Sequence, residues 1–147
     1  MSNHKGTVIQ VMGPVLDIRF PDDHLPQLLN AIEIPNGDKV IVAEVAQHIG
    51  DNVVRTIAMS STDGLQRGVE AIDTGAPITV PVGDECLGRV FNLLGQPIDN
   101  GAPVEAAESW PIHRSAPSYE EQQPATEILE TGIKVIDLIC PYAKGGK

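Results

Sequence analysis

Short runs of β-branched and aliphatic residues, separated by turn-forming residues, dominate residues 1–80 and constrain the fold most strongly. In the run Val15–Phe20, apolar and charged side chains alternate, which is the period of a half-buried strand. Six runs are predicted to be strands: Thr7–Met12, Val15–Phe20, Ala31–Pro35, Asp38–Gln47, Val53–Met59 and Pro77–Pro81. A loop-rich stretch is expected after the turn signals around Asp63-Gly64.

The turns between these strands favour a closed sheet. Gly13-Pro14 and Gly50-Asp51-Asn52 separate neighbouring runs, and Asn36-Gly37 is a pair that tolerates positive φ at both central positions of a hairpin turn. Short strands at this spacing favour a barrel or a sandwich, and closure removes the exposed edges of a small sheet. We predict a mainly β chain, with a small closed six-stranded β-barrel over residues 1–81.

Composition and charge exclude some classes of partner. Aromatic residues make up 3% of the chain, so the core must be aliphatic. The net charge is −10, and residues 1–80 and 81–147 each carry ten acids and five bases. Since nucleic-acid binding depends on clustered Lys and Arg, this balance argues against a nucleic-acid partner, and equally against an anionic membrane surface.

Residues 82–147 have a different character. Cys86–Leu94 resembles one more strand, Ala102–Pro124 is irregular, and Trp110 is expected to hold this linker against a domain face. A helix is predicted from Gly132, with Thr131 as its cap and Pro141 as its stop. We interpret residues 82–147 as a linker and the incomplete start of an α/β nucleotide-binding domain.

The end of the chain invites comparison with a phosphate-binding loop. That loop needs a glycine five residues before its Gly-Lys pair and a hydroxyl residue after the lysine. Here Pro141 occupies the first position, and no residue follows Lys147. Gly145-Gly146-Lys147 is therefore predicted to be a polar turn.

No other group of residues assembles a reaction centre, so we predict no catalytic, cofactor-binding or metal-binding residue. The histidines have no Cys or carboxylate partner at metal-ligand spacing, and the serines do not lie in the Gly-x-Ser-x-Gly context of a nucleophile elbow. The two adjacent glutamates are expected to lie in a solvated turn, and Asp137 is expected to be an exposed acid on the helix. The two cysteines are expected to be free thiols in a reducing compartment. The residues considered are His4, His24, His48, His113, Ser60, Ser61, Ser109, Glu120, Glu121, Asp137, Cys86 and Cys140.

Targeting signals are not visible. The start, Met1–Lys5, has neither the apolar region of a secretory signal nor the Arg-rich character of a transit peptide. No apolar run approaches transmembrane length. We expect a soluble, cytosolic protein.

Three segments carry a resemblance to a known family. Gly6–Ile18 is similar to the opening strands of rotary ATPase subunits, and Gly88–Asp99 resembles a signature shared across that superfamily. Thr126–Lys147 resembles the catalytic beta subunit of F-type ATP synthase immediately ahead of its phosphate-binding loop. The alpha subunit and the vacuolar-type and flagellar export relatives share the middle signature but differ in the last segment.

The resemblance implies a barrel that is the amino-terminal crown domain of a subunit truncated before its phosphate-binding loop. In that family, six such barrels from alternating alpha and beta subunits form a ring around a central gamma stalk. The parent enzyme couples proton-driven rotation to ATP synthesis from ADP and phosphate with Mg²⁺, runs hydrolysis in reverse, and is peripheral at the cytoplasmic side of the bacterial membrane. Mg-ATP and Mg-ADP would be cofactors of the parent, and the present chain alone is expected to be inactive and to show no measurable ATP binding.

No catalytic or ligand residue of the family has a counterpart here. The resemblance transfers structural positions only: Gly13, Pro14, Asp17, Gly88, Arg89, Gly95 and Asp99. Two alternatives remain open, a free-standing β-barrel interaction module and a subunit of a related rotary or export ATPase. A third, an oligonucleotide-binding barrel, conflicts with the charge.

Overall fold

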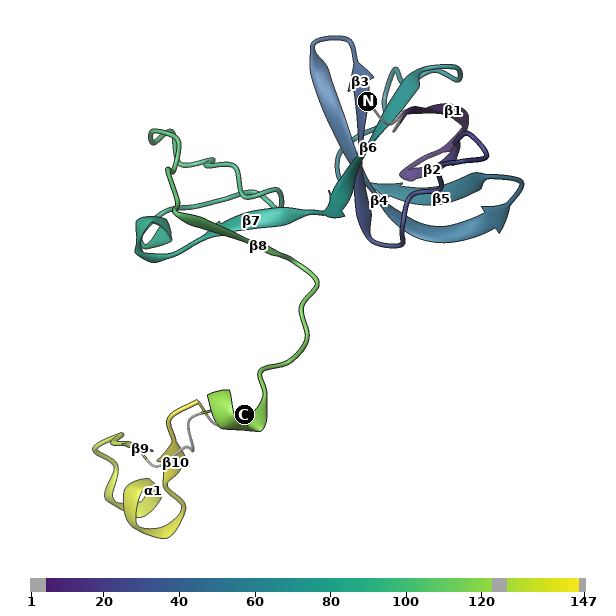
Figure 1. Ribbon diagram of the computed structural model, residues 1–147. Helices are drawn as coiled ribbons and strands as arrows, with labels where there is room; N and C mark the ends of the chain where they lie inside the picture. Colours follow the sequence, from purple (N-terminus) through teal and green to yellow (C-terminus); the bar gives the residue numbers. More distant parts are fainter. Residues whose placement is uncertain (1–4, 123–126, 146–147) are drawn as a thin grey trace. The chain divides into compact units, whose positions relative to one another are not determined.

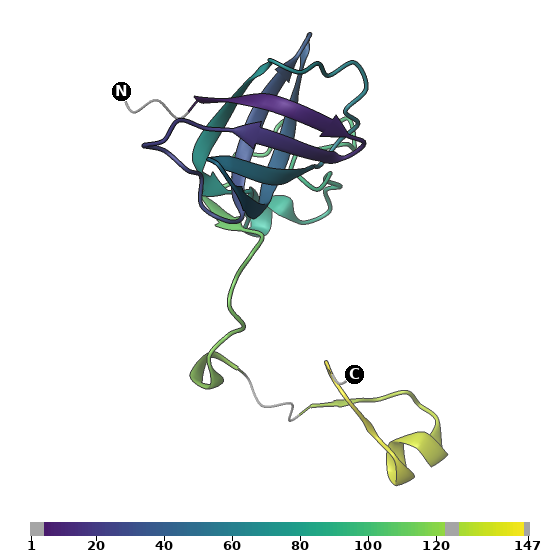
Figure 2. The same ribbon diagram turned by 90° about the vertical axis from the view of Figure 1, so that its right-hand side faces the viewer.

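The computed structural model describes residues 5–122 and 127–145. It divides the chain into two compact units, Met1–Arg114 and Ser115–Lys147. The ribbon views in Figures 1 and 2 show a barrel in the first unit and a short helix with two small strands in the second. Each unit is described by itself.

A closed barrel of six antiparallel strands forms the body of the first unit, in the order β1-β2-β5-β4-β3-β6. The strands are β1 Lys5–Met12, β2 Val15–Arg19, β3 Asn30–Asn36, β4 Lys39–Gly50, β5 Val53–Ala58 and β6 Glu70–Pro77. The predicted mainly β fold with a closed six-stranded barrel is therefore confirmed.

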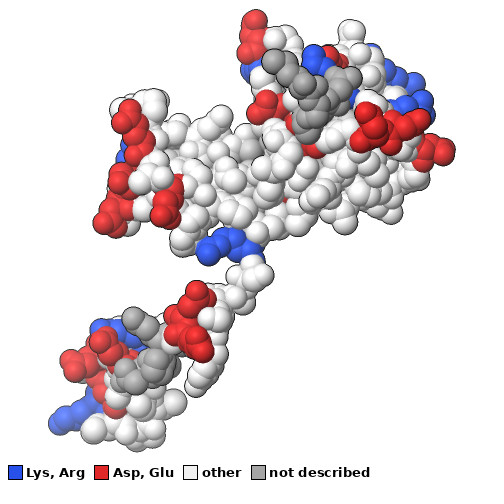
Figure 3. Space-filling model, in the orientation of Figure 1, with Lys and Arg blue, Asp and Glu red and all other residues white. Residues whose placement is uncertain are grey.

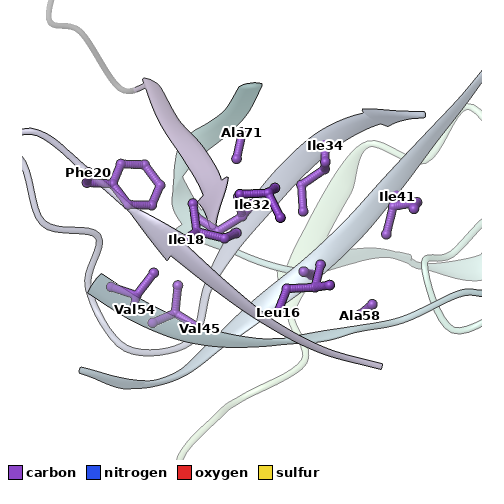
Figure 4. Packing of buried hydrophobic residues seen from close by; sticks show 12 residues of the cluster. Leu16, Ile18, Phe20, Ile32, Ile34, Ile41, Val45, Val54, Ala58 and Ala71 are labelled. Carbon is purple, nitrogen blue, oxygen red and sulfur yellow. The ribbon is translucent and has the colours of Figure 1, made fainter. Parts of the chain in front are cut away.

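The barrel interior is filled by aliphatic side chains, as the low aromatic content requires. Figure 4 shows side chains from several strands converging on this interior, with Phe20 as the aromatic member. Leu16 and Ile18 of β2 are fully buried, while Asp17 between them points to the outer surface, where it pairs with Arg55. Because burying a Leu or Ile side chain contributes about 1.5–3 kcal/mol, this interior is the main source of the barrel's stability.

The sixth strand differs from the sequence prediction. Pro77–Pro81 was predicted to be the last strand of the barrel, after a loop-rich stretch that follows Asp63-Gly64, but β6 Glu70–Pro77 closes the barrel by pairing with both β1 and β3. The inward positions of β6 are Ala71 and Asp73, a small residue and a charged one. The sequence of β6 therefore lacks the alternation of apolar and polar residues by which a half-buried strand is predicted.

The hairpin turn between β3 and β4 contains one of the predicted turn pairs, Asn36-Gly37. Asn36 pairs with Lys39, so the central turn residues are Gly37 and Asp38, one position later than predicted. Gly37 has φ 63°, as the first central residue of a tight hairpin turn requires.

The rest of the first unit contains a second, smaller sheet. Strand β7 Thr79–Val82 pairs with β8 Glu108–Pro111, and a short 3₁₀ turn, η1 Asp84–Cys86, lies between them. The prediction of a strand over Cys86–Leu94 was wrong, because that segment forms turns with one isolated bridge at Phe91. Irregular structure was predicted for Ala102–Pro124; β8 lies within that range, and so does a second 3₁₀ turn, η2 Tyr119–Glu121, which belongs to the second unit.

The second unit consists of strands β9 Ile128–Leu129 and β10 Tyr142–Ala143, which pair, and helix α1 Lys134–Ile139 between them. The predicted helix is confirmed, but its N-cap is Ile133 and not Thr131. Thr131 lies two residues before the N-cap, and its Oγ1 accepts a hydrogen bond from the main-chain N–H of Ile133 at 3.1 Å.

Candidate functional site

A clasp between Arg89 and Asp99 organises the segment that follows β7. The Arg89 guanidinium donates to the Asp99 carboxylate from Nε at 2.6 Å and from Nη2 at 3.0 Å, and also to the Ala102 carbonyl at 2.7 Å. Asp99 further accepts the Gly101 N–H at 2.9 Å. Hydrogen bonding by Arg89, more than any other contact, lowers the pKa of Asp99 below its usual range. We call Arg89, Asp99, Gly101 and Ala102 together the Arg89 clasp.

A second ion pair lies on the outer surface of the barrel. Asp17 and Arg55 are directly opposite each other on β2 and β5, and the guanidinium binds the carboxylate through two hydrogen bonds of 2.8 and 2.9 Å. The Asp17 side chain is only 4% exposed, whereas that of Arg55 is 39% exposed. The hydrogen bond and charge of Asp17 raise the pKa of Arg55.

The glycines and the proline that carry the family resemblance hold turns. Gly13 has φ 60°, and the Pro14 carbonyl accepts the Ala58 N–H at 2.7 Å, which ties the β1–β2 turn to β5. Gly88 and Gly95 also have positive φ, and a side chain at Gly95 would collide with Pro81. The role of these residues is therefore to permit the main-chain conformation of the turns.

The histidines do not gather. His24 Nε2 lies 2.9 Å from Asp73 Oδ2, and the buried Asp73 also accepts a hydrogen bond from Asn30 Nδ2 at 3.0 Å. His48 Nε2 lies 2.8 Å from the Pro26 carbonyl oxygen.

His113 is held apart from the other two, with its Nε2 2.8 Å from Glu44 Oε2. His4 lies outside the described residues. Within residues 5–122 and 127–145, no three His, Cys, Asp or Glu side chains form a metal-binding group.

The serines take part in local structure. Ser61 Oγ donates to Asp63 Oδ2 at 2.7 Å, Ser60 is exposed, and Ser109 pairs with Pro81 in the β7–β8 ladder. None of these contacts joins a serine to a histidine, so they do not resemble a nucleophile–base pair.

The acidic candidates stabilise turns. Glu121 accepts hydrogen bonds from the N–H and the hydroxyl of Ser118, which closes a capping box on η2, and Glu120 is exposed beside it. Asp137 is not the solvated helical acid that was predicted. Its carboxylate accepts the Thr131 hydroxyl at 2.6 Å and the Gly132 N–H at 3.0 Å, and the Thr131 hydrogen bond is the main cause of its lowered pKa.

Trp110 lies on β8 and is 43% exposed. The guanidinium of Arg114 stacks 3.7 Å from the centre of its ring, and its Nε1 donates to Glu108 at 3.3 Å. The ring therefore has a nearby cation as a partner, and the role of Trp110 in holding the linker against a domain face stays a prediction.

Gly145 has φ 77° and lies in the turn after β10, while Gly146 and Lys147 lie outside the described residues. Cys86 is half-buried and Cys140 is exposed, and both are free thiols.

One cleft was not foreseen from the sequence. It has a volume of about 770 Å³ and lies between the β3–β4 hairpin, the end of β5 and the turn Asn92–Gln96. Its lining combines Lys39 with the carboxylates of Glu33 and Asp63. Sequence patterns could not indicate it, because its walls come from segments far apart in the chain.

Among the described residues, no helix has both the length and the apolar character that crossing a membrane requires.

The barrel is similar to a domain of a known protein family. The matched segment begins at Val8 in β1 and ends at Gly75 in β6, so it takes in all six strands of the closed sheet. Residues 8–75 match the family model described as ATP synthase alpha/beta family, beta-barrel domain.

Proposed function

We propose that this chain is part of the catalytic beta subunit of a proton-driven rotary ATP synthase, and that its barrel supplies ring assembly and not chemistry. The observation that carries the proposal is the closed barrel itself, whose six strands coincide with the segment matched by the family model. Within that assembly the parent subunit would make ATP from ADP and phosphate with Mg²⁺ and hydrolyse it in reverse.

The choice of the beta subunit rests on the segments after the barrel. The family model covers alpha and beta subunits alike, whereas Thr126–Lys147 is similar to the beta subunit in particular. Arg89 and Asp99, the ion pair of the Arg89 clasp, both lie in the other resembling segment, Gly88–Asp99, and give these two positions of the signature a structural role.

The outer face of β1, β2 and β5 supports a role in assembly. Met12 pairs with Val15, and Val15 pairs with Ile57, so three apolar side chains lie side by side across three strands. Met12 is 41% and Ile57 45% exposed. We call these three residues the outer apolar row.

Other parts of the barrel surface are already occupied by this chain. His113 contacts Glu44 on β4, and the turn Asn92–Gln96 lines clefts against β3 and β4. The outer apolar row is therefore the surface that we assign to a neighbouring alpha subunit, since burying apolar area drives most association.

Charge gives further support. Figure 3 shows acidic groups over the drawn face with only scattered basic ones, in keeping with the net charge of −10. Such a surface fits protein partners in a complex at the cytoplasmic side of the bacterial membrane better than direct contact with anionic lipid or nucleic acid.

The test is to mix the purified chain with a purified bacterial ATP synthase alpha subunit and to measure the complex by analytical ultracentrifugation. We expect a complex with alpha that Ile57→Glu weakens and Val40→Glu does not, since Val40 is equally apolar and 58% exposed but lies outside the outer apolar row. Failure of the wild-type chain to bind alpha, together with binding to beta, would instead favour an alpha-type or related rotary or export subunit. Binding to neither would favour a free-standing interaction module.

A further inference from the structure

The chain contains two asparagine–glycine pairs, Asn36-Gly37 and Asn100-Gly101. In such a pair the glycine main-chain nitrogen can attack Cγ of the asparagine, because glycine has no Cβ to hinder the approach. The new N–Cγ bond forms as the Cγ–Nδ2 bond breaks, and the proton that the glycine nitrogen loses passes by way of a base to Nδ2, which leaves as ammonia. Water then opens the succinimide ring at either carbonyl, which yields aspartate or isoaspartate.

The structure restrains the first pair. Asn36 is the last residue of β3 and pairs with Lys39 across the hairpin. Its Nδ2, the leaving group, donates a 3.0 Å hydrogen bond to the Asp63 carbonyl, and the side chain is half-buried. Reaction at Asn36 requires this bond to break and the hairpin end to open.

In the second pair, the asparagine side chain that carries the leaving group is not restrained in this way. Asn100 is exposed, lies in a bend with φ 58°, and its side chain has no hydrogen-bond partner in the described part of the chain. The Gly101 N–H donates to the Asp99 carboxylate at 2.9 Å, so an anionic acceptor lies beside the proton that the attacking nitrogen must lose.

We propose that Asn100 is a self-modification site that converts to aspartate and isoaspartate in the folded protein, while Asn36 is protected. The product would act on the Arg89 clasp. Isoaspartate places an extra methylene in the main chain between Asp99 and Gly101, where Arg89 holds both Asp99 and the Ala102 carbonyl. Conversion at Asn100 therefore loosens the clasp.

The experiment ages the folded, full chain at mildly alkaline pH and follows both pairs by peptide mapping. Trypsin separates them into the peptides Phe20–Lys39 and Val90–Arg114, tandem mass spectrometry locates each conversion, and isoaspartyl methyltransferase reports the isoaspartate. We expect Asn100 to convert about fivefold faster than Asn36, the factor that one retained hydrogen bond of about 1 kcal/mol at Asn36 provides.

Two controls separate structure from local sequence. In concentrated urea both pairs lose their tertiary surroundings, so their rates should converge. Asn100→Gln should remove most of the methyl-acceptor signal from the folded protein, whereas Asn36→Gln should leave it in place. Equal rates in the folded chain, or faster conversion at Asn36, would overturn the proposal.

Discussion

The carboxylate of Asp17 and the guanidinium of Arg55 meet on the outer surface of the barrel through two parallel hydrogen bonds, although each belongs to a strand whose neighbouring residues face the core. Asp17 is almost fully buried at this position because Arg55 lies over it. The pair thereby joins β2 to β5 through side chains as well as through the main-chain ladder.

Removing the Arg55 guanidinium should leave the buried carboxylate of Asp17 without a partner of opposite charge. We expect Arg55→Leu to lower the midpoint of thermal unfolding, measured by circular dichroism, because Asp17 is left without its charged partner. Asp17→Asn introduced into the same variant should recover part of the loss. Arg19→Leu is the matched control, since Arg19 is exposed on β2 and has no side-chain hydrogen bond or ion pair among the described residues. A loss as large in the control would mean that the pair is not the cause.

The barrel interior should respond to cavity formation. Leu16 is fully buried, so Leu16→Ala is expected to reduce the free energy of unfolding by about 2–5 kcal/mol. Ile57→Ala, one strand away but on the outer surface, should cost less than about 1 kcal/mol. Urea unfolding measures both, and similar losses would contradict the assigned faces of β2 and β5.

Substitution by alanine should destabilise the protein at both Gly6 and Gly13, but for different physical reasons. A Cβ at Gly6 would lie 2.8 Å from the Arg19 carbonyl oxygen and 2.9 Å from the Phe20 ring, so Gly6→Ala should destabilise by about 1–3 kcal/mol through overpacking. Gly13 has open space around it but φ 60°, so Gly13→Ala should cost about 1 kcal/mol in backbone strain.

Phe20→Leu separates these two causes. The smaller side chain should relieve part of the cost of Gly6→Ala and none of the cost of Gly13→Ala. Additive effects of Phe20→Leu and Gly6→Ala would rule out the collision with the Phe20 ring and leave the one with the Arg19 carbonyl oxygen.

The Arg89 clasp should persist in acid. Because the folded-state pKa of Asp99 is depressed, its contribution to stability is fully present above the ordinary aspartate pKa of about 3.9 and is lost only as pH falls through the lower folded value. A carbon-13 NMR titration of the Asp99 carboxyl should therefore show a midpoint below the ordinary range. Arg89→Gln should move that midpoint upward, and an ordinary midpoint in the wild-type chain would show that the clasp is not formed in solution.

The barrel could be predicted from the sequence because five of its strands display their burial pattern locally. In β2, for example, Leu16 and Ile18 alternate with Asp17 along the chain, and that period is readable without any partner. The sixth strand could not be found in this way. Its buried Asp73 is tolerated only because Asn30 and His24 reach it from a distant segment.

The same distinction holds for the clasp and for Asp137. The spacing of Arg89 and Asp99 is visible in the sequence, and their resemblance to a family signature marks the segment, yet a strand was predicted there. Hydrogen bonds from Arg89 to Asp99 and Ala102 instead hold it in turns. Asp137 was predicted to be a solvated acid because helical spacing says nothing of the Thr131 hydroxyl that folds back onto it.

By itself the sequence determined the fold class, the aliphatic core and most strand positions, since these follow from the order of apolar and turn residues along the chain. Only the tertiary structure decided which strand closes the barrel, which charges pair and which asparagine is restrained, because each depends on contacts between residues remote in sequence.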